Sequence, residues 1–99
     1  MSDRYNVAIM GATGAVGQIF LELLAERDFP MDELRLLASS RSVGKALTCG
    51  ERTLKVQELT HDAFDGIDIV LSSAGGAISK EFVPSAIAAG AVVVDNTSA

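Results

Sequence analysis

The feature that most constrains the fold is a glycine pattern near the start of the chain, in which Gly11, Gly14 and Gly17 are spaced three apart. The pattern directly follows an apolar segment, residues 5–10, and opens a helical pattern at Ala15. This order of strand, glycine turn and helix suits a bound pyrophosphate, because a helix N-terminus presents unpaired N–H donors and the positive end of its dipole to an anion. The chain is therefore expected to begin with a strand and a helix that can bind a dinucleotide.

Each glycine has a separate expected role. Gly11 permits a sharp exit from the strand, Gly14 lets the backbone approach a phosphate closely, and Gly17 lets the helix pack tightly on the strand. The spacing is a variant of the commoner GxGxxG, and a glycine turn that only joins a strand to a helix would look similar. We expect cofactor contacts from five residues of this segment: Gly11, Thr13, Gly14, Ala15 and Val16.

Apolar segments alternate with helical patterns along the rest of the chain. We expect strands over residues 5–10, 34–38, 67–72 and 91–95, helices over 15–27 and 78–89, a hairpin from 46–49 and 52–57, and one helical turn over 60–64. Strands that alternate with helices form βαβ units around a parallel sheet. The predicted fold class is α/β, a doubly wound, mainly parallel sheet of the Rossmann type with a small hairpin insertion.

The first predicted helix carries its apolar residues at helical spacing, and one face of it should pack on the sheet. The residues of that face are Val16, Ile19, Phe20, Leu23 and Leu24. In the second helix, Pro84 either produces a kink or starts a separate helical piece.

Composition narrows the functional classes. With 99 residues and 48% apolar residues the chain is one globular domain, and its net charge of −5 argues against nucleic acid as a partner. One cysteine and one histidine predict neither a disulfide framework nor a metal site. No signal peptide or membrane-spanning apolar stretch is recognisable. We therefore expect a cytoplasmic protein with a small-molecule ligand.

The loop after the second predicted strand indicates which dinucleotide is bound. An NAD site places an acidic residue there to bind the ribose 2′-hydroxyl, but no acid stands between Glu33 and Glu51. The loop instead holds Ser39, Arg41 and Ser42, whose hydroxyl and guanidinium donors can bind a 2′-phosphate. These residues predict NADP as the cofactor. The alternative is an ordinary solvated polar loop.

A second loop of small residues, Ser73-Ala74-Gly75-Gly76, follows the strand predicted over 67–72. It would allow close backbone approach to a nicotinamide ribose or a diphosphate. Alternatively it is only a strand-to-helix turn, with Ser79 as the N-cap of the helix.

No residue pair in the chain resembles an activated nucleophile. Cys49 lies in a predicted hairpin arm without a nearby base, and we expect it to be half-buried and unreactive. His61 has no evident partner in the sequence and is expected at a helix start, without a catalytic role.

Four segments in fixed order resemble the amino-terminal part of the aspartate-semialdehyde dehydrogenase family. They are Val7–Gly17, Leu37–Lys45, Ser73–Ser79 and Val92–Ala99, of which the second and fourth are more specific than any glycine turn. The resemblance implies an NADP-dependent enzyme that reductively dephosphorylates L-aspartyl 4-phosphate to L-aspartate 4-semialdehyde, in the biosynthesis of lysine, threonine, methionine and diaminopimelate. It also implies a homodimeric or homotetrameric parent enzyme.

The family's catalytic cysteine and histidine would lie after residue 99, and Cys49 and His61 do not match their motifs. Residues 1–99 are therefore expected to be a dinucleotide-binding domain that lacks the catalytic and dimerisation domain. Asn96 follows the last strand at the edge where substrate would meet the nicotinamide, so it is the candidate substrate-binding residue, with a turn-capping role as the alternative.

Two other functions fit the same architecture. One is a related acyl-phosphate reductase of the N-acetyl-glutamyl-phosphate reductase type. The loop Ser39–Ser42 and the segment Asp95–Ser98 argue against that alternative. The other is a non-catalytic paralogue that keeps the dinucleotide-binding fold without the nucleophile.

Overall fold

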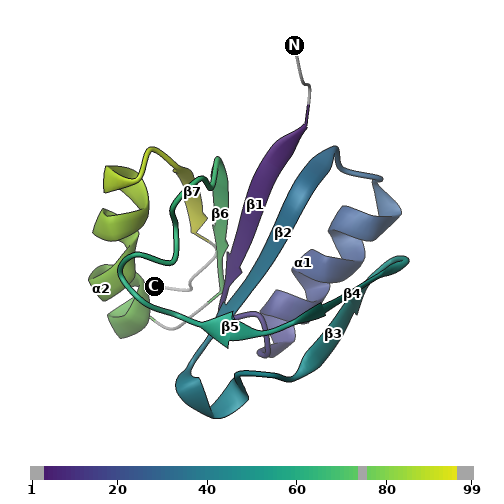
Figure 1. The fold of residues 1–99 in the computed structure, drawn as a ribbon, viewed down its shortest axis with the longest axis horizontal. Coiled ribbons are helices and arrows are strands. Elements are labelled where there is room, and N and C mark those ends of the chain that lie inside the picture. The colour runs from purple at the N-terminus through teal and green to yellow at the C-terminus, as the bar shows by residue number, and fades with distance from the viewer. Residues whose placement is uncertain (1–3, 74–75, 96–99) are drawn as a thin grey trace.

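The computed structural model describes residues 4–73 and 76–95 of the chain. A five-stranded sheet with the order β5-β2-β1-β6-β7 forms its centre, and every pair of neighbouring strands is parallel. Figure 1 shows α2 beside β7 and α1 on the side of β2. The described elements are β1 (Tyr5–Met10), α1 (Ala15–Glu26), β2 (Met31–Ala38), the 3-10 helix η1 (Ser40–Ser42), β3 (Ala46–Cys49), β4 (Arg52–Lys55), β5 (Gln57–Glu58), β6 (Ile69–Ser72), α2 (Gly76–Ala88) and β7 (Val92–Asp95).

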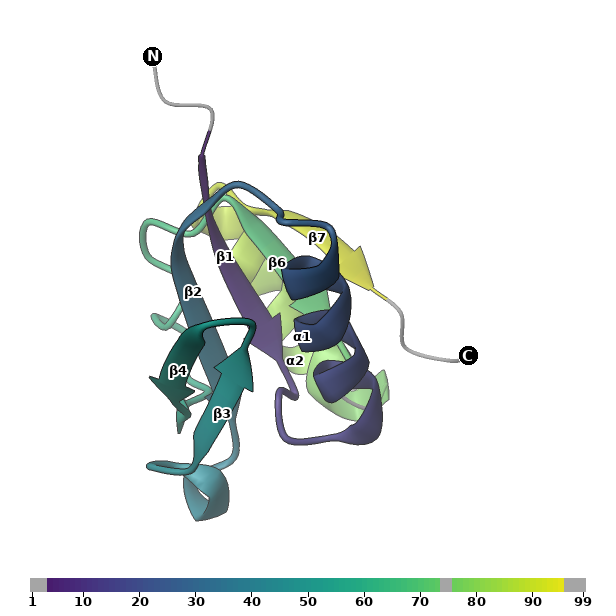
Figure 2. The same ribbon diagram turned by 90° about the vertical axis from the view of Figure 1, so that its right-hand side faces the viewer.

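The sheet has apolar side chains on both faces, as a parallel sheet covered by helices requires. In β1, Val7 and Ile9 point into the core under α1, and Ala8 and Met10 point into the core under α2. All four side chains are buried, so the central strand is a continuous apolar run. Figure 2 shows α1 on the near side of the strands and α2 on the far side. The predicted α/β, doubly wound, mainly parallel fold is confirmed.

The predicted hairpin is also confirmed. β3 and β4 pair antiparallel, and Gly50 in their turn has a φ of 61°, in the left-handed region that favours glycine. The second arm is shorter than the predicted 52–57: β4 ends at Lys55, and the buried Val56 separates it from β5. β5 then leaves the hairpin and pairs with β2 at the edge of the main sheet.

Several predicted boundaries move. β2 begins three residues earlier than predicted, at Met31, because Met31 already pairs with Tyr5 of β1. The Tyr5 N–H donates to Pro30 O at 2.9 Å, directly before this strand. β6 begins at Ile69 and β7 at Val92, both later than predicted. Residues 61–66 form turns instead of a helix. Pro84 lies inside the continuous helix α2.

The buried face of α1 differs from the predicted one. Gly17, Leu21 and Leu24 are the buried residues of this helix. Ile19 and Leu23 are 51% and 40% exposed, so the prediction that they pack on the sheet is wrong for the described residues. The side of the helix that carries Gly17 lies against Gly11 and Ala12 of the glycine turn, and Ile19 and Leu23 lie toward solvent.

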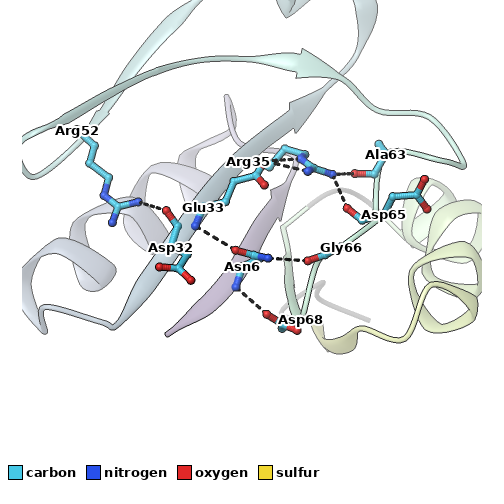
Figure 3. Close-up of polar contacts among 9 residues, drawn as sticks. All are labelled: Asn6, Asp32, Glu33, Arg35, Arg52, Ala63, Asp65, Gly66 and Asp68. Atoms are coloured by element: carbon cyan, nitrogen blue, oxygen red, sulfur yellow. Dashed lines mark hydrogen bonds and ion pairs between the residues drawn. The ribbon is translucent and has the colours of Figure 1, made fainter. Parts of the chain in front are cut away.

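A polar network fixes the end of the sheet where the strands begin (Figure 3). Asn6 receives a hydrogen bond from Glu33 N at 3.2 Å and donates its amide to Gly66 O at 2.9 Å, while its backbone N–H donates to Asp68 at 2.8 Å. Arg35 donates to Ala63 O at 2.6 Å and forms an ion pair with Glu33 at 2.8 Å. These contacts tie the turn before β6 to β1 and β2. The candidate site lies at the opposite end of the sheet, at the carboxyl ends of the strands, where open parallel sheets bind their ligands.

Candidate dinucleotide-binding site

The glycine turn between β1 and α1 is anchored to the neighbouring strand. Gly11 N–H and Ala12 N–H both donate to Leu37 O, at 2.9 and 3.2 Å. Gly11 has a φ of 85°, which side chains rarely adopt, so this residue makes the sharp exit predicted from the sequence. Ala12 is fully buried beneath the turn. The turn is consequently held in one position relative to β2.

Gly17 and Gly14 are glycine for different reasons. A Cβ on Gly17 would lie 2.5 Å from Gly11 O and 2.7 Å from Ala12 O, so the helix can lie this close to the turn only without a side chain there. A Cβ on Gly14 would lie 3.5 Å from Gly11 O, an ordinary contact, and its φ of −76° suits any residue. The packing of the protein therefore requires glycine at position 17 but not at position 14.

The first turn of α1 can offer its backbone N–H donors to an anion, because the turn carries no negatively charged side chain. Gly14 is the N-cap residue and has no side chain with which to cap the helix, and the first turn holds no acidic residue. Ala15 and Val16 form the start of this turn, the first exposed and the second half-buried. An anion beside this terminus would meet unpaired N–H groups and the positive end of the helix dipole.

A hollow of about 410 Å³ lies beside the turn. It is lined by Gly11, Thr13, Gly14, Ala38, Ser39, Leu59, Ser73, Ile78 and Phe82. The structure thus brings together predicted residues from the loops after β1, β2 and β6. None of the described residues that line the hollow is acidic, so no carboxylate among them repels a phosphate.

Ser73 supports the glycine turn as well as lining the hollow. Its hydroxyl lies 3.1 Å from Met10 O and 3.0 Å from Gly11 O, and its backbone N–H donates to Met10 O at 2.9 Å. The adjacent Ser72 is buried and shares a hydrogen bond of 2.9 Å with Ser79. Ser79 is therefore a buried residue within α2, and the alternative that it is the N-cap is wrong.

The second predicted loop forms η1 just after β2. Ser42 N–H donates to Ser39 O at 2.9 Å, which closes the short helix. Ser39 and Arg41 are exposed, and Ser42 is half-buried. Within residues 4–73 and 76–95, the Arg41 side chain makes no hydrogen bond or ion pair. Its guanidinium is therefore available to a ligand at the carboxyl end of β2.

Three predicted residues, Ala74, Gly75 and Asn96, lie outside the described part of the chain. Gly76 is the first residue of α2 and is exposed. The contacts with cofactor or substrate that we expect from these four residues remain predictions.

Sequence reasoning missed the apolar wall of the hollow, which Leu59, Ile78 and Phe82 supply. Ile78 and Phe82 are four residues apart in α2 and so lie on the same side of the helix. That spacing could have indicated the wall, but apolar residues at helical spacing are by default assigned to a core.

His61 has partners that the sequence did not reveal. Its Nδ1 lies 2.7 Å from Ser85 Oγ, its Nε2 lies 3.4 Å from Glu81, and its ring lies 4.6 Å from the Phe82 ring. The expectations that it has no partner and begins a helix are wrong, because the turn it belongs to packs against α2. Beside it, a hydrogen bond from Thr60 lowers the pKa of Asp62.

Cys49 is buried rather than half-buried, with 5% of its surface exposed, and its Sγ lies 3.3 Å from Leu21 O. Burial raises the pKa of the thiol, only partly offset by the positive charge of Arg52. A protonated, inaccessible thiol is a poor nucleophile, so the residue is structural. In the part of the chain that the structure describes, no group of three or more His, Cys, Asp or Glu side chains could hold a metal ion.

A doubly wound parallel sheet with a glycine turn, an uncapped helix N-terminus and a hollow at the carboxyl ends of its strands defines a nucleotide-binding domain of the Rossmann type. Residues 6–99 match the family model described as semialdehyde dehydrogenase, NAD binding domain. The chain belongs to that family. Within residues 4–73 and 76–95, no helix is long and apolar enough to cross a membrane.

Proteins named aspartate-semialdehyde dehydrogenase are similar over nearly the whole chain. The Legionella pneumophila protein is 58% identical over 98 residues, which is 99% of this chain and 28% of that protein. The crystal structure of aspartate semialdehyde dehydrogenase II from Vibrio cholerae complexed with ASA has 51% identity and a TM-score of 0.92, covering 97% of this chain and 31% of that one. The Candida albicans enzyme, solved with NADP, has 31% identity and a TM-score of 0.78, covering 95% and 30%. The chain thus spans about three-tenths of the length of its relatives.

Proposed function

We propose that this chain is the NADP-binding domain of an aspartate-semialdehyde dehydrogenase. The full enzyme would convert L-aspartyl 4-phosphate, NADPH and a proton into L-aspartate 4-semialdehyde, NADP⁺ and inorganic phosphate. This reaction would serve lysine, threonine, methionine and diaminopimelate biosynthesis. The supporting observation is the convergence of the glycine turn, the acid-free loop after β2 and Ser73 on one hollow.

NADPH, when bound, supplies the hydride for this reduction. The residues of this chain would bind and orient it. The first turn of α1, with Thr13 and Gly14, would hold the diphosphate, because its N–H groups point outward without an internal cap. Leu59, Ile78 and Phe82 would form an apolar wall for a planar base.

The loop after β2 would choose NADP over NAD. A 2′-phosphate next to Ser39 and Ser42 would receive hydroxyl hydrogen bonds, and the exposed Arg41 would add charge-assisted ones. The C. albicans enzyme solved with NADP supports this choice.

We place the catalytic cysteine and histidine outside residues 1–99, since Cys49 is buried and His61, exposed beside Ser85 and Glu81, is not among the residues that line the hollow. Asn96 is proposed to contact the acyl phosphate or the released phosphate. The parent enzyme is proposed to be a cytoplasmic homodimer or homotetramer, with small molecules as its ligands. The names of its relatives favour this function over an N-acetyl-glutamyl-phosphate reductase.

Isothermal titration of the chain with NADPH and NADH tests the cofactor assignment. Arg41→Ala should weaken NADPH binding by about 1.5–3 kcal/mol, or roughly 10- to 150-fold, because one charged hydrogen-bonded contact is lost. NADH binding should not change. Lys45→Ala is the matched control, since Lys45 is the other exposed cation of the loop. The proposal would be contradicted if Arg41→Ala weakened the binding of NADPH and NADH equally. It would also be contradicted if Lys45→Ala weakened NADPH binding as much as Arg41→Ala does.

A further inference from the structure

The loop after β2 that carries Arg41 and Ser42 ends in a type II β-turn over residues 42–45. Val43 has a φ of −58° and a ψ of 132°, and Gly44 has a φ of 91°, which are close to the two central conformations of this turn. Lys45 N–H closes the turn by donating to Ser42 O at 3.1 Å. Because the third residue of a type II turn has a positive φ, the conformation of Gly44 fixes the direction in which the chain leaves η1.

The same glycine begins a β-bulge at the open end of the hairpin. Gly44 N–H donates to Val56 O at 2.9 Å, and Val56 N–H donates to Lys45 O at 2.8 Å. Two consecutive residues thus face one residue of the opposite segment, and the first of them is a glycine with a positive φ, which is the G1 type of bulge. Val56 is 1% exposed and belongs to the core under α1. The turn is therefore fastened to a residue that the core holds in place.

The beginning of the loop is fastened to the same short segment. Leu59 N–H donates to Ala38 O at 2.8 Å, and Ala38 pairs with Glu58 of β5. Ala38 and Leu59 also line the hollow beside the glycine turn. Both ends of the loop are thus held by residues 56–59, next to the candidate cofactor site. Among the described residues the Arg41 side chain has no polar partner, so the backbone of the loop sets where its guanidinium can reach.

Lack of space does not explain the glycine at position 44. A Cβ there would meet no atom of the described residues within 4 Å, so only the backbone conformation disfavours a side chain. Gly90, in the turn between α2 and β7, has the same two properties: its φ is 95°, and a Cβ on it would meet no described atom within 4 Å. Gly90 lies at the amino end of β7, whereas the hollow lies at the carboxyl ends of the strands. The two glycines therefore form a matched pair, one in the loop and one far from it.

We propose that Gly44 is a positioning residue for dinucleotide selection. Its turn and bulge hold η1 so that the Arg41 guanidinium and the Ser42 hydroxyl reach the 2′-phosphate of NADP together, while Gly44 itself does not touch the cofactor. A guanidinium is a rigid, planar donor, so a change in backbone direction beneath it weakens its hydrogen bonds to a phosphate. This inference rests on the proposed function, because it takes the loop after β2 to be the part that selects NADP.

Gly44→Ala tests the proposal in calorimetric titrations of the chain with NADPH and NADH. Alanine is disfavoured at a φ of 91°, so the turn should change its type, and the Kd for NADPH should rise by about fivefold or more. The Kd for NADH, which has no 2′-phosphate, should stay within about twofold of the wild-type value. Gly90→Ala should change neither Kd, although it introduces the same backbone strain. Thermal melts of the two alanine variants should show similar losses of stability.

Gly44→Asn provides a rescue. Asparagine also tolerates the third position of a type II turn, so the Kd for NADPH should remain within about twofold of the wild-type value. A loss of NADPH affinity equal to that of Gly44→Ala would overturn the inference, because the turn would then not be what matters at this position.

A double variant separates this inference from the proposed function. If Gly44 acts by positioning Arg41, then Arg41→Ala combined with Gly44→Ala should weaken NADPH binding by less than the product of the two single effects. Effects that multiply in full would overturn the inference, as would an unchanged preference for NADPH in Gly44→Ala or an equal loss of NADPH affinity in Gly90→Ala. If Arg41→Ala itself leaves the preference for NADPH unchanged, the proposed function is contradicted too. If Arg41→Ala reduces that preference and Gly44→Ala does not, only the positioning role of Gly44 is wrong.

Discussion

The two glycines at the start of α1 should respond to substitution in opposite ways. In Gly17→Ala the new Cβ would lie 2.5 Å from Gly11 O, whereas ordinary contact begins at 3.4 Å. The helix or the turn must therefore move by roughly 0.9 Å, the difference between these two distances. The turn resists this movement because Gly11 N–H is hydrogen-bonded to Leu37 O at 2.9 Å.

The magnitude follows from two opposing effects. Overpacking against backbone costs up to about 3 kcal/mol. Alanine regains about 1 kcal/mol over glycine inside a helix. The net loss should be about 2 kcal/mol, which corresponds to a fall in Tm of roughly 8–16 °C for a domain of this size.

Gly14→Ser should leave stability unchanged or raise it by a few tenths of a kcal/mol, because serine is a good N-cap and a Cβ at this position makes an ordinary contact. Its side chain would nevertheless occupy the place proposed for the diphosphate. NADPH binding should therefore fall in both variants, but only Gly17→Ala should melt earlier.

Thermal denaturation and NADPH titration of the two variants provide the assay. If Gly17→Ala melts at the same temperature as the wild type, the close approach of helix and turn does not require glycine at position 17. If Gly14→Ser binds NADPH with normal affinity, the diphosphate does not lie against this residue. Either result refutes the corresponding part of the reasoning.

Three further predictions concern other parts of the molecule. Arg35→Ala should lower the free energy of unfolding by about 1–3 kcal/mol in urea titrations, because the carbonyl oxygen of Ala63 loses its donor; an unchanged midpoint would contradict this. Burial raises the pKa of Cys49, so its contribution to stability is complete below the unfolded thiol pKa of about 8.5 and is lost as pH rises further; in Cys49→Ala, the Tm should therefore fall less steeply between pH 8 and 10 than it does in the wild type. In the full-length enzyme, Asn96→Ala should impair the kinetics with phosphate and leave NADPH affinity intact, and a lower melting midpoint with unchanged kinetics would instead indicate a turn cap.

Much of the fold was predictable because local and global signals agree. The apolar run of β1 and the glycines that follow it specify strand, turn and helix within a dozen residues, and the structure contains each of them. Gly50 lies between the two predicted arms of the hairpin, and its positive φ suits the turn between β3 and β4. Where a single residue dictates the backbone, sequence reasoning succeeds.

Contacts between distant segments were not predictable. His61 meets Ser85, 24 positions away, only because residues 61–66 fold back on α2. Ser79 was a plausible N-cap by composition, but α2 begins three residues earlier and buries it against Ser72. In each case a polar side chain was assigned from its neighbours in sequence, whereas its partner came from another element.

The α1 helix shows a different limit, which concerns how many surfaces one apolar stripe serves. Its stripe from Val16 to Leu24 is wide enough to suggest a single buried face, yet only part of it contacts the sheet. Gly17 accounts for this difference between the predicted and the buried face. Because it has no side chain, its side of the helix lies against the glycine turn, and Ile19 and Leu23 lie outward. A hydrophobic pattern records all the surfaces that a helix buries in its final assembly, and it does not distinguish one partner from two. The apolar pattern alone therefore could not show that Gly17, and not Ile19 or Leu23, lies on the buried side of α1.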